Sequence, residues 1–340
     1  MGGTMNSKDN QPDASIVKDS KGWVSYRPEL KILDCTIRDG GLMNDHKFDN
    51  KFIKAIYDAC VDAGVDYMEI GYKCDRKLFT PTQYGPWKFC DESDMKKVLG
   101  ENETDLKISV MADVERTDYK NDFLKKEESL IDLIRVATYI HQIPTAIEYI
   151  KEAHDKGYET SVNIMAISTV QEWELDAALE ALANSPVDTI YLVDSFGSLY
   201  QEQVSYLMRK YLKAANAAGK QVGIHTHNNL QLAYSNTITA IIEGANMLDA
   251  TIDGMGRGSG NCPLELLTGF LHNPKYHQRP VIKCLQETVR PLRKNLLWGY
   301  EVPYLLTGQL NLHPRSAMKF MESAENQDYV KFYDTVFQEE

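Results

Sequence analysis

The chain of 340 residues carries a formal net charge of −12 and has a pI near 5.2, so it lacks the basic excess that favours binding to nucleic acid or anionic membranes. Its hydrophobic content of 43% and charged content of 25% are typical of a soluble globular protein. The six cysteines include no C-x-x-C pair, which favours free thiols in a reducing compartment. No apolar run is long enough to span a membrane. We therefore expect a cytoplasmic protein without nucleic-acid or membrane partners.

The chain divides by composition into three parts. Residues 1–21 are polar with almost nothing to bury, and we expect a disordered leader there. Strand-like and helix-like segments alternate over residues 22–272. Residues 273–340 show only helical patterns, which indicates either a small C-terminal helical extension or a contact between the subunits of a homo-oligomer.

The middle part contains eight short apolar or β-branched segments that are typical of buried strands. These segments cover residues 31–36, 67–72, 107–112, 133–138, 160–166, 189–193, 221–225 and 247–252. Helical spacing fills the intervals and is clearest over residues 144–156, 170–183, 200–218 and 230–243. Gly157, Gly219 and Gly244 each follow one of these helices, where glycine ends a helix without strain.

Strict alternation of strands and helices predicts parallel strands joined by crossover helices. Eight such units in this length match the α/β architecture of a (β/α)₈ TIM barrel. An open, doubly wound sheet is the alternative. The closed barrel has one further merit, because it brings the end of the first strand close to the end of the seventh.

Two histidines mark the end of the seventh predicted strand. Side chains on a strand alternate between its faces, so His225 and His227 point the same way. Asp39 follows the first strand, in a loop expected at residues 38–41, and two histidines with one carboxylate bind a divalent cation while leaving coordination positions open. We expect Mn²⁺ or Mg²⁺ there. Read separately, the histidines are polar residues that close a strand, and Asp39 is a turn residue or a helix cap.

Two further residues are candidates for the same site: Arg38, next to Asp39, and Asn261, which follows the eighth strand. Arg38 is cationic at any working pH and can steady the oxygen of an enolate, although a surface salt bridge is the alternative. After the eighth strand, glycines at 254, 256, 258 and 260 let the backbone approach a ligand, but their spacing matches neither a P-loop nor G-x-G-x-x-G. Asn261 follows these glycines as either a helix cap or a group at the metal.

Three segments carry a family resemblance: T-I-R-D-G after the first strand, H-T-H-N-N-L at the seventh, and E-G-A-N-M-L-D-A-T-I-D-G-M-G-R-G-S-G-N-C-P-L-E at the eighth. The sequence resembles the DRE-TIM metallolyase superfamily of aldolases, lyases and Claisen-type synthases, and within it the 4-hydroxy-2-oxovalerate aldolases. The likeness spans about residues 30–267. It implies that Asp39, His225 and His227 bind the metal and that Arg38 stabilises a pyruvate enolate. In the lyase branch the asparagine at the position of Asn261 also approaches the metal.

One departure from the aldolase pattern concerns the proton carrier. The aldolases have a histidine two residues after R-D-G, which is the proposed general base, whereas this chain has Leu42, and leucine cannot move a proton. Either His46 or a water held by the metal takes over, or the reaction differs. Tyr300, after Gly299, resembles an active-site tyrosine of the aldolases. The tail from residue 273 is only loosely similar to the aldolase domain that couples to an aldehyde dehydrogenase.

The sequence as a whole predicts a metal-dependent aldolase that makes or breaks a carbon–carbon bond of a 2-oxo acid through a pyruvate-type enolate, with an aldehyde as the second substrate. A Claisen-type enzyme that condenses an acyl-CoA is one alternative, favoured if the long connection over residues 73–90 binds a large thioester. A barrel that has lost catalysis and serves as a binding subunit is the other. Leu42 supports that last alternative, and the intact ligand set opposes it.

Overall fold

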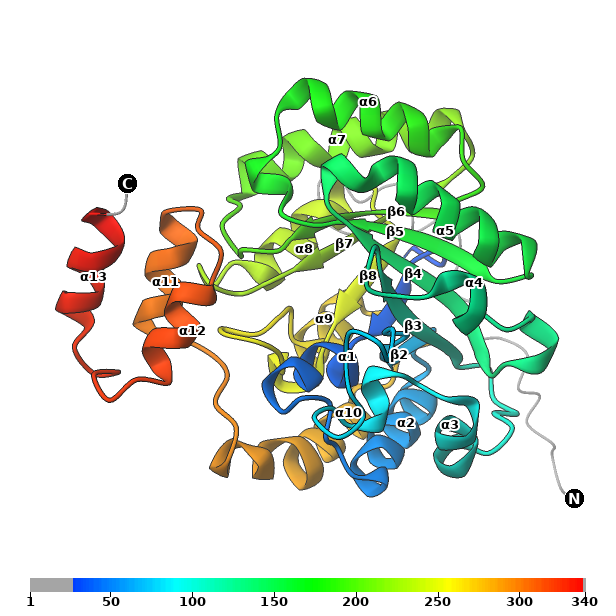
Figure 1. Ribbon diagram of the computed structural model, residues 1–340, viewed down its shortest axis with the longest axis horizontal. Coiled ribbons are helices and arrows are strands. Elements are labelled where there is room, and N and C mark those ends of the chain that lie inside the picture. The colour runs from blue at the N-terminus through cyan, green and yellow to red at the C-terminus, as the bar shows by residue number, and fades with distance from the viewer. Residues whose placement is uncertain (1–26, 339–340) are drawn as a thin grey trace, which may run out of the picture.

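The computed structural model describes residues 27–338 and shows a closed barrel of eight parallel strands in the order β1 to β8 (Figure 1). The strands are β1 (Lys31–Asp34), β2 (Tyr67–Tyr72), β3 (Lys107–Asp113), β4 (Ile131–Thr138), β5 (Glu159–Ile164), β6 (Thr189–Asp194), β7 (Gln221–Thr226) and β8 (Met247–Ala250). Pairing of β1 with β8 closes the barrel. The predicted (β/α)₈ barrel is confirmed, whereas the leader expected over residues 1–21 lies outside the described residues.

Helices surround the barrel and continue beyond it (Figure 1). They are α1 (Thr36–Gly40), α2 (Asn50–Ala63), α3 (Glu92–Leu99), α4 (Tyr119–Asp122), α5 (Ile143–Asp155), α6 (Glu172–Ala183), α7 (Gln201–Ala217), α8 (Ala233–Glu243), α9 (Leu264–Leu271), α10 (Gln278–Cys284), α11 (Val302–Gln309), α12 (Arg315–Met321) and α13 (Tyr329–Gln338). Between residues 27 and 338, none of them combines the length and the apolar character that crossing a membrane requires.

Helix α2 shows how local sequence sets an element of the outer layer. Asp49 caps its first turn by accepting a hydrogen bond from the Phe52 backbone N–H at 2.8 Å. The apolar residues of the helix recur at helical spacing and are buried against the barrel core. Gly64 ends the helix with a φ of +71°, a conformation that side chains with a Cβ avoid.

The C-terminal residues pack in two different ways. Helix α10 lies against α2, and the segment that follows it contributes Val289 and Trp298 to the main hydrophobic core. Helices α11 to α13 instead enclose a separate cluster built on Tyr304, Ala317 and Phe332. This group of helices lies beside the barrel in Figure 1, where it is coloured orange to red. The predicted helical extension is therefore present, and its last three helices have an apolar core of their own.

Candidate active site

The structure brings Asp39, His225 and His227 together at the mouth of the barrel, the end at which the strands finish. One potential ligand atom from each residue lies within 4.8 Å of the others, and all three residues are buried. Thr226, between the two histidines, points to the other side of β7, where its hydroxyl donates to the Ala233 carbonyl at 3.0 Å. The strand alternation that predicts a shared face for the histidines therefore holds at this position.

Asp39 reaches the mouth from a short helix, which corrects the sequence expectation of a loop at residues 38–41. The Asp39 backbone N–H donates to the Cys35 carbonyl at 2.9 Å, and this helical bond forms α1 directly after β1. The chain leaves the strand two residues earlier than predicted, because Cys35 and Thr36 already turn into the helix. The turn directs both Arg38 and Asp39 into the site.

A buried carboxylate fixes the orientation of His225. Its Nδ1 lies 2.9 Å from Asp249 Oδ2, and because the carboxylate only accepts, the imidazole donates. Burial alone would raise the pKa of Asp249, but Arg135 and His225 hold it below its usual value, so the group is ionised. The other ring nitrogen, Nε2, is buried without a hydrogen-bond partner among the described residues. A histidine held in this way presents a free lone pair, as metal ligands do.

Asn261 also lies beside the cluster and contacts both His227 and Asp39. Its backbone pairs with that of His227 in an isolated bridge, and its side-chain NH₂ donates to Asp39 Oδ2 and to the Met255 carbonyl. The amide oxygen is buried without a partner in the described chain. Helix α9 begins at Leu264 without a side-chain cap, so Asn261 does not act as its cap.

The charge state of the cluster suits a divalent cation. Burial alone would raise the pKa of Asp39, but Arg38, the two histidines and Asn261 outweigh it and hold that pKa well below its usual range. Burial lowers the pKa of His227 to about 3, so the ring is neutral. An ionised carboxylate, a neutral imidazole and an amide oxygen are forms that bind such a cation, and the residues present therefore fit the metal that the sequence predicts.

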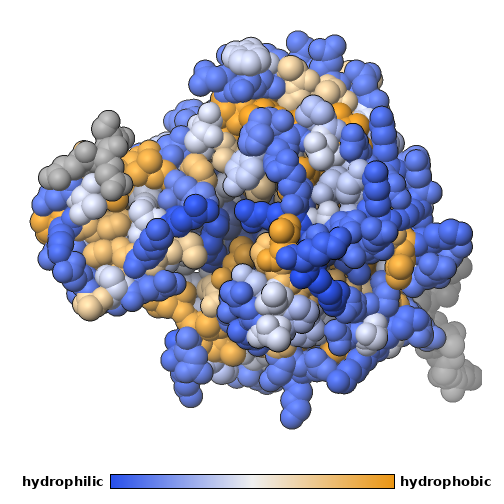
Figure 2. All heavy atoms as spheres, viewed as in Figure 1, coloured by the Kyte–Doolittle hydropathy of each residue, from blue (hydrophilic) through white to orange (hydrophobic). Residues whose placement is uncertain are grey.

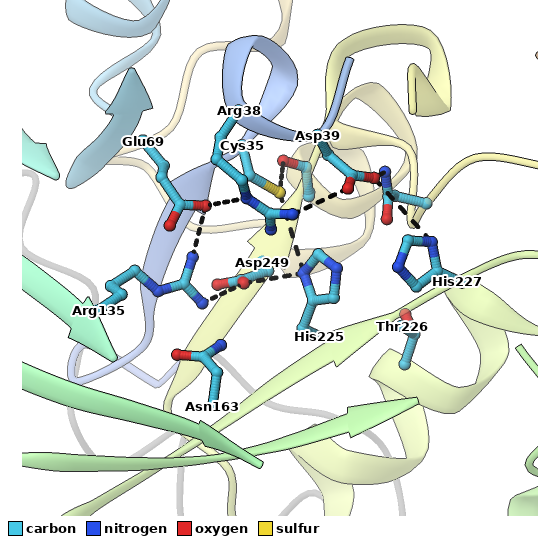
Figure 3. A network of polar contacts seen from close by, with 12 residues as sticks. Cys35, Arg38, Asp39, Glu69, Arg135, Asn163, His225, Thr226, His227 and Asp249 are labelled. Atoms are coloured by element: carbon cyan, nitrogen blue, oxygen red, sulfur yellow. Dashed lines mark hydrogen bonds and ion pairs between the residues drawn. The ribbon is translucent and has the colours of Figure 1, made fainter. Parts of the chain in front are cut away.

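A chain of buried ion pairs supports the cluster from inside the barrel (Figure 3). Glu69 Oε2 accepts from Arg38 Nε at 2.7 Å and from Arg135 Nη1 at 2.9 Å. Arg135 Nη2 donates in turn to Asp249 at 2.5 Å, and Arg38 Nη1 donates to Asp39 at 2.8 Å. The chain of contacts therefore links Asp39 to the carboxylate that orients His225.

Sequence reasoning missed Glu69, Arg135 and Asp249. Each stands within a strand that is otherwise apolar, as in YMEIGY, LIRVAT and MLDA. A buried charge needs a partner, so charged residues in buried strands were the available signal.

A cavity of about 600 Å³ opens above the cluster, within the range of small-molecule sites. Figure 2 shows a hollow between the C-terminal helices and the barrel, bordered by strongly hydrophilic side chains. The lining combines Arg38, Asp39 and both histidines with side chains from β3, from the glycine-rich loop and from α12 and the turn before it. Those last contributors are Asp113, Arg257, His313, Arg315 and Met318.

Leu42 and the two catalytic candidates from the sequence, His46 and Tyr300, occupy different places. Leu42 lines the cavity, as the aldolase pattern predicts for that position. His46 is 1% exposed, is absent from the lining, and packs edge-on against Tyr72, which does line it. Burial, helped by Lys88 and Arg38, lowers the pKa of His46 to about 3. Tyr300 is 56% exposed and does not line the cavity.

Comparisons with known proteins identify the family of the chain. The model of the HMGL-like family matches residues 29–288. A 4-hydroxy-2-oxovalerate aldolase of Thermus thermophilus is 31% identical over 71% of this chain and 68% of its own, and an oxaloacetate decarboxylase of Mycobacterium tuberculosis is 28% identical over 71% and 69%. The crystal structure of the N-terminal domain of a Bacteroides vulgatus protein, provisionally assigned as an aldolase, superposes with a TM-score of 0.77 at 32% identity, covering 87% of this chain and 98% of that one.

The chain belongs to the HMGL-like family, and the resemblance to the DRE-TIM enzymes is confirmed. It is a carbon–carbon lyase. The alternative of a barrel without catalysis is therefore not supported.

Proposed function

We propose that the protein is a divalent-metal-dependent aldolase that acts on a 2-oxo acid through a pyruvate-type enolate. The observation that carries the proposal is the meeting of Asp39, His225 and His227 beside Arg38 at the floor of the cavity. Asn261 is the fourth proposed ligand, through its unpartnered amide oxygen. When bound, Mn²⁺ or Mg²⁺ would act as a Lewis acid toward the carbonyl and carboxylate oxygens of the substrate.

Arg38 is placed to stabilise charge on the reacting oxygen. Glu69 and Asp39 hold two of its guanidinium nitrogens, so the side chain is fixed before substrate arrives. Its pKa lies well above the usual value because those carboxylates outweigh the effect of burial. A preorganised cation in a site of low dielectric constant stabilises a developing enolate more than it would in water.

Cleavage breaks the bond between the carbon next to the oxo group and the carbon that bears the hydroxyl group. The electron pair passes into the enolate, the hydroxyl proton goes to a base, and the aldehyde leaves. We assign the base to Asp113, which lines the cavity and makes no side-chain hydrogen bond or ion pair within residues 27–338. Burial raises the pKa of Asp113, and a raised pKa suits a carboxylate that must take and return a proton near neutral pH.

Matched variants separate the candidates for the proton step. Asp113→Asn keeps the shape of the side chain and should lower turnover by about 10²–10⁴, with Mn²⁺ affinity unchanged. His46→Ala and Tyr300→Phe test the residues proposed from the sequence in the same way. If His46→Ala shows the large loss at an unchanged melting temperature and Asp113→Asn does not, His46 is the base.

Proton exchange tests the enolate before any aldehyde is known. Protein with Mn²⁺ in D₂O should exchange the methyl protons of pyruvate, and a chelator or Arg38→Ala should abolish the exchange. Mn²⁺ should bind at about one ion per chain, and Asp39→Ala or His225→Ala should weaken it greatly. Exchange of acetyl-CoA protons in place of pyruvate protons would favour the Claisen-type alternative. Bound metal without any exchange would contradict the proposal.

A second candidate reaction is the decarboxylation of oxaloacetate. The relative from Mycobacterium tuberculosis carries that name, and loss of CO₂ from oxaloacetate leaves the same pyruvate enolate at the same site. Release of pyruvate from oxaloacetate at a higher kcat/KM than from any hydroxy-oxo acid would identify this activity.

A further inference from the structure

Of the four arginines that line the cavity, three have no carboxylate partner of the kind that holds Arg38. Arg38 is held by two carboxylates, whereas Arg116, Arg257 and Arg315 make no side-chain hydrogen bond or ion pair within residues 27–338. An arginine usually satisfies its donors with carboxylates, carbonyls or water. Arginines that converge on one cavity without internal partners point to a ligand that supplies the acceptors.

Arg257 stands on the glycine-rich loop between the proposed metal ligands and α11. A Cβ at Gly256 would lie 2.4 Å from Asp39 Oδ2, and one at Gly258 would lie 3.2 Å from the Tyr304 ring. The loop is therefore clamped on both sides, and the residue between these glycines faces the cavity. Its Nε is buried without a partner in the described chain, which is a costly state for a charged group that no ligand satisfies.

Arg315, at the start of α12, is the second arginine that we consider after Arg257. The Asn311 side chain bonds to Ser198 Oγ at 2.8 Å and to the Ser168 carbonyl at 3.1 Å, and these bonds fix the C-terminal segment across the barrel mouth. The Arg315 backbone N–H donates to His313 Nδ1 at 3.1 Å, so the proton of the neutral ring is on Nε2. Both side chains line the cavity.

His313 lies near both arginines. Burial, followed by Arg257 and Arg315, lowers its pKa to about 4, so the ring is neutral and donates one hydrogen bond. Arg257 follows Gly256, which packs against Asp39, so Arg257 stands beside the proposed metal site and lines the cavity above it. The acidic lining residues occupy other elements: Asp39 lies on α1, Asp113 ends β3, and Glu115 accepts from Gln142.

We propose that Arg257, Arg315 and the His313 ring form a subsite for the anionic group, a carboxylate or a phosphate, of the aldehyde substrate. The proposal rests on the proposed aldolase function and names the class of its second substrate. The 2-oxo acid lies on the floor of the cavity beside Arg38, and the aldehyde reaches from it to the rim. Two guanidinium groups and a neutral N–H donor offer hydrogen bonds to anionic oxygens, which an uncharged aldehyde does not supply, and the buried Arg257 Nε has no acceptor in the described chain.

Binding and turnover of matched aldehydes test the subsite. Succinic semialdehyde is compared with butanal, and glyceraldehyde 3-phosphate with glyceraldehyde, first by calorimetric titration without pyruvate and then by kcat/KM with pyruvate. Either the carboxylate or the phosphate member should bind at least about 10-fold tighter than its neutral partner, and the preferred member identifies the anion.

Variants of the subsite test which groups recognise the anion. Arg315→Met and Arg257→Met should each remove about 10-fold or more of this preference, and Arg315→Lys should keep part of it. Lys319→Met removes the same charge one turn further along α12, outside the cavity lining, and should leave the preference unchanged.

The outcomes separate this proposal from the function on which it rests. Equal binding of charged and neutral aldehydes, or a preference that survives both Arg→Met changes, overturns the subsite even if the protein exchanges pyruvate protons. A preference that Arg315→Met abolishes supports the subsite. If the same protein exchanges no pyruvate protons, the aldolase function fails while the anion site stands.

Discussion

Asp249→Asn tests whether the ion-pair chain serves the metal site. Asp249 Oδ2 accepts hydrogen bonds from His225 and from Arg135, both at 2.9 Å or less. The amide that replaces the carboxylate has the same shape but carries no charge and only one acceptor oxygen. If that oxygen stays with Arg135, the His225 ring loses the contact that sets its orientation and its tautomer.

The expected size of the effect follows from the role of such contacts. Loss of a carboxylate that orients a ligating histidine lowers metal affinity by about 10- to 100-fold, or about 1.4–2.7 kcal/mol. Mn²⁺ affinity is measured by titration with detection of the free ion by electron paramagnetic resonance. Thermal unfolding runs in parallel, because a partly unpaired Arg135 also destabilises the fold.

Asp132→Asn is the matched control. Asp132 accepts from the Ile108 backbone N–H at 2.8 Å and pairs with Lys126, near the end of the barrel where β3 and β4 begin. This change should lower stability without altering Mn²⁺ affinity. An unchanged dissociation constant in folded Asp249→Asn would refute the reasoning, because His225 would then keep its geometry without the carboxylate.

Three further predictions follow from the same geometry. Gly256→Ala should lower Mn²⁺ affinity at least 10-fold, because its Cβ would lie 2.1 Å from Asn261 Nδ2 and 2.4 Å from Asp39 Oδ2; an unchanged affinity would mean that the loop yields. Burial raises the pKa of Asp34 to about 7, so the folded protein binds more protons than the unfolded one between about pH 4 and 7, and stability should fall by up to about 4 kcal/mol across that window. Denaturant unfolding of Asp34→Asn should lack this contribution, and parallel pH curves for parent and variant would count against it. Mn²⁺ at 100 times its dissociation constant should raise the free energy of unfolding by about 2.7 kcal/mol in the parent, and titration that leaves the melting temperature unchanged would argue against a site in the native state.

Much of the fold could be predicted from the sequence because the signals are local. Apolar runs that cannot face water define the strands, and Gly219 and Gly244 adopt the positive φ that the helix ends require. The errors lie where the chain leaves a strand. The loop expected at residues 38–41 is a short helix, and β8 ends at Ala250 because a 3₁₀ turn follows at Ile252–Gly254.

The candidate site could be predicted only where its residues carry a motif. His225 and His227 stand two apart on one strand, so a period of two suffices to join them. His313 and Arg315 follow no pattern that relates them to the barrel mouth. Their position depends on long-range contacts such as Ser198 to Asn311, which only the folded chain reveals.

The buried charges explain why the site acts as one unit. Inside the barrel two guanidinium groups, Arg38 and Arg135, meet three carboxylates, Asp39, Glu69 and Asp249. A buried excess of one negative charge is unfavourable in a medium of low dielectric constant. The positive charge of a divalent cation bound at Asp39 would offset it. Removing any one carboxylate therefore changes more than its own contact, since it also shifts the balance that retains the cation. The effects of two substitutions within this set of buried ion pairs should be non-additive. The effect of any one of them should instead add to the effect of Asp132→Asn, because Asp132 is distant from the set.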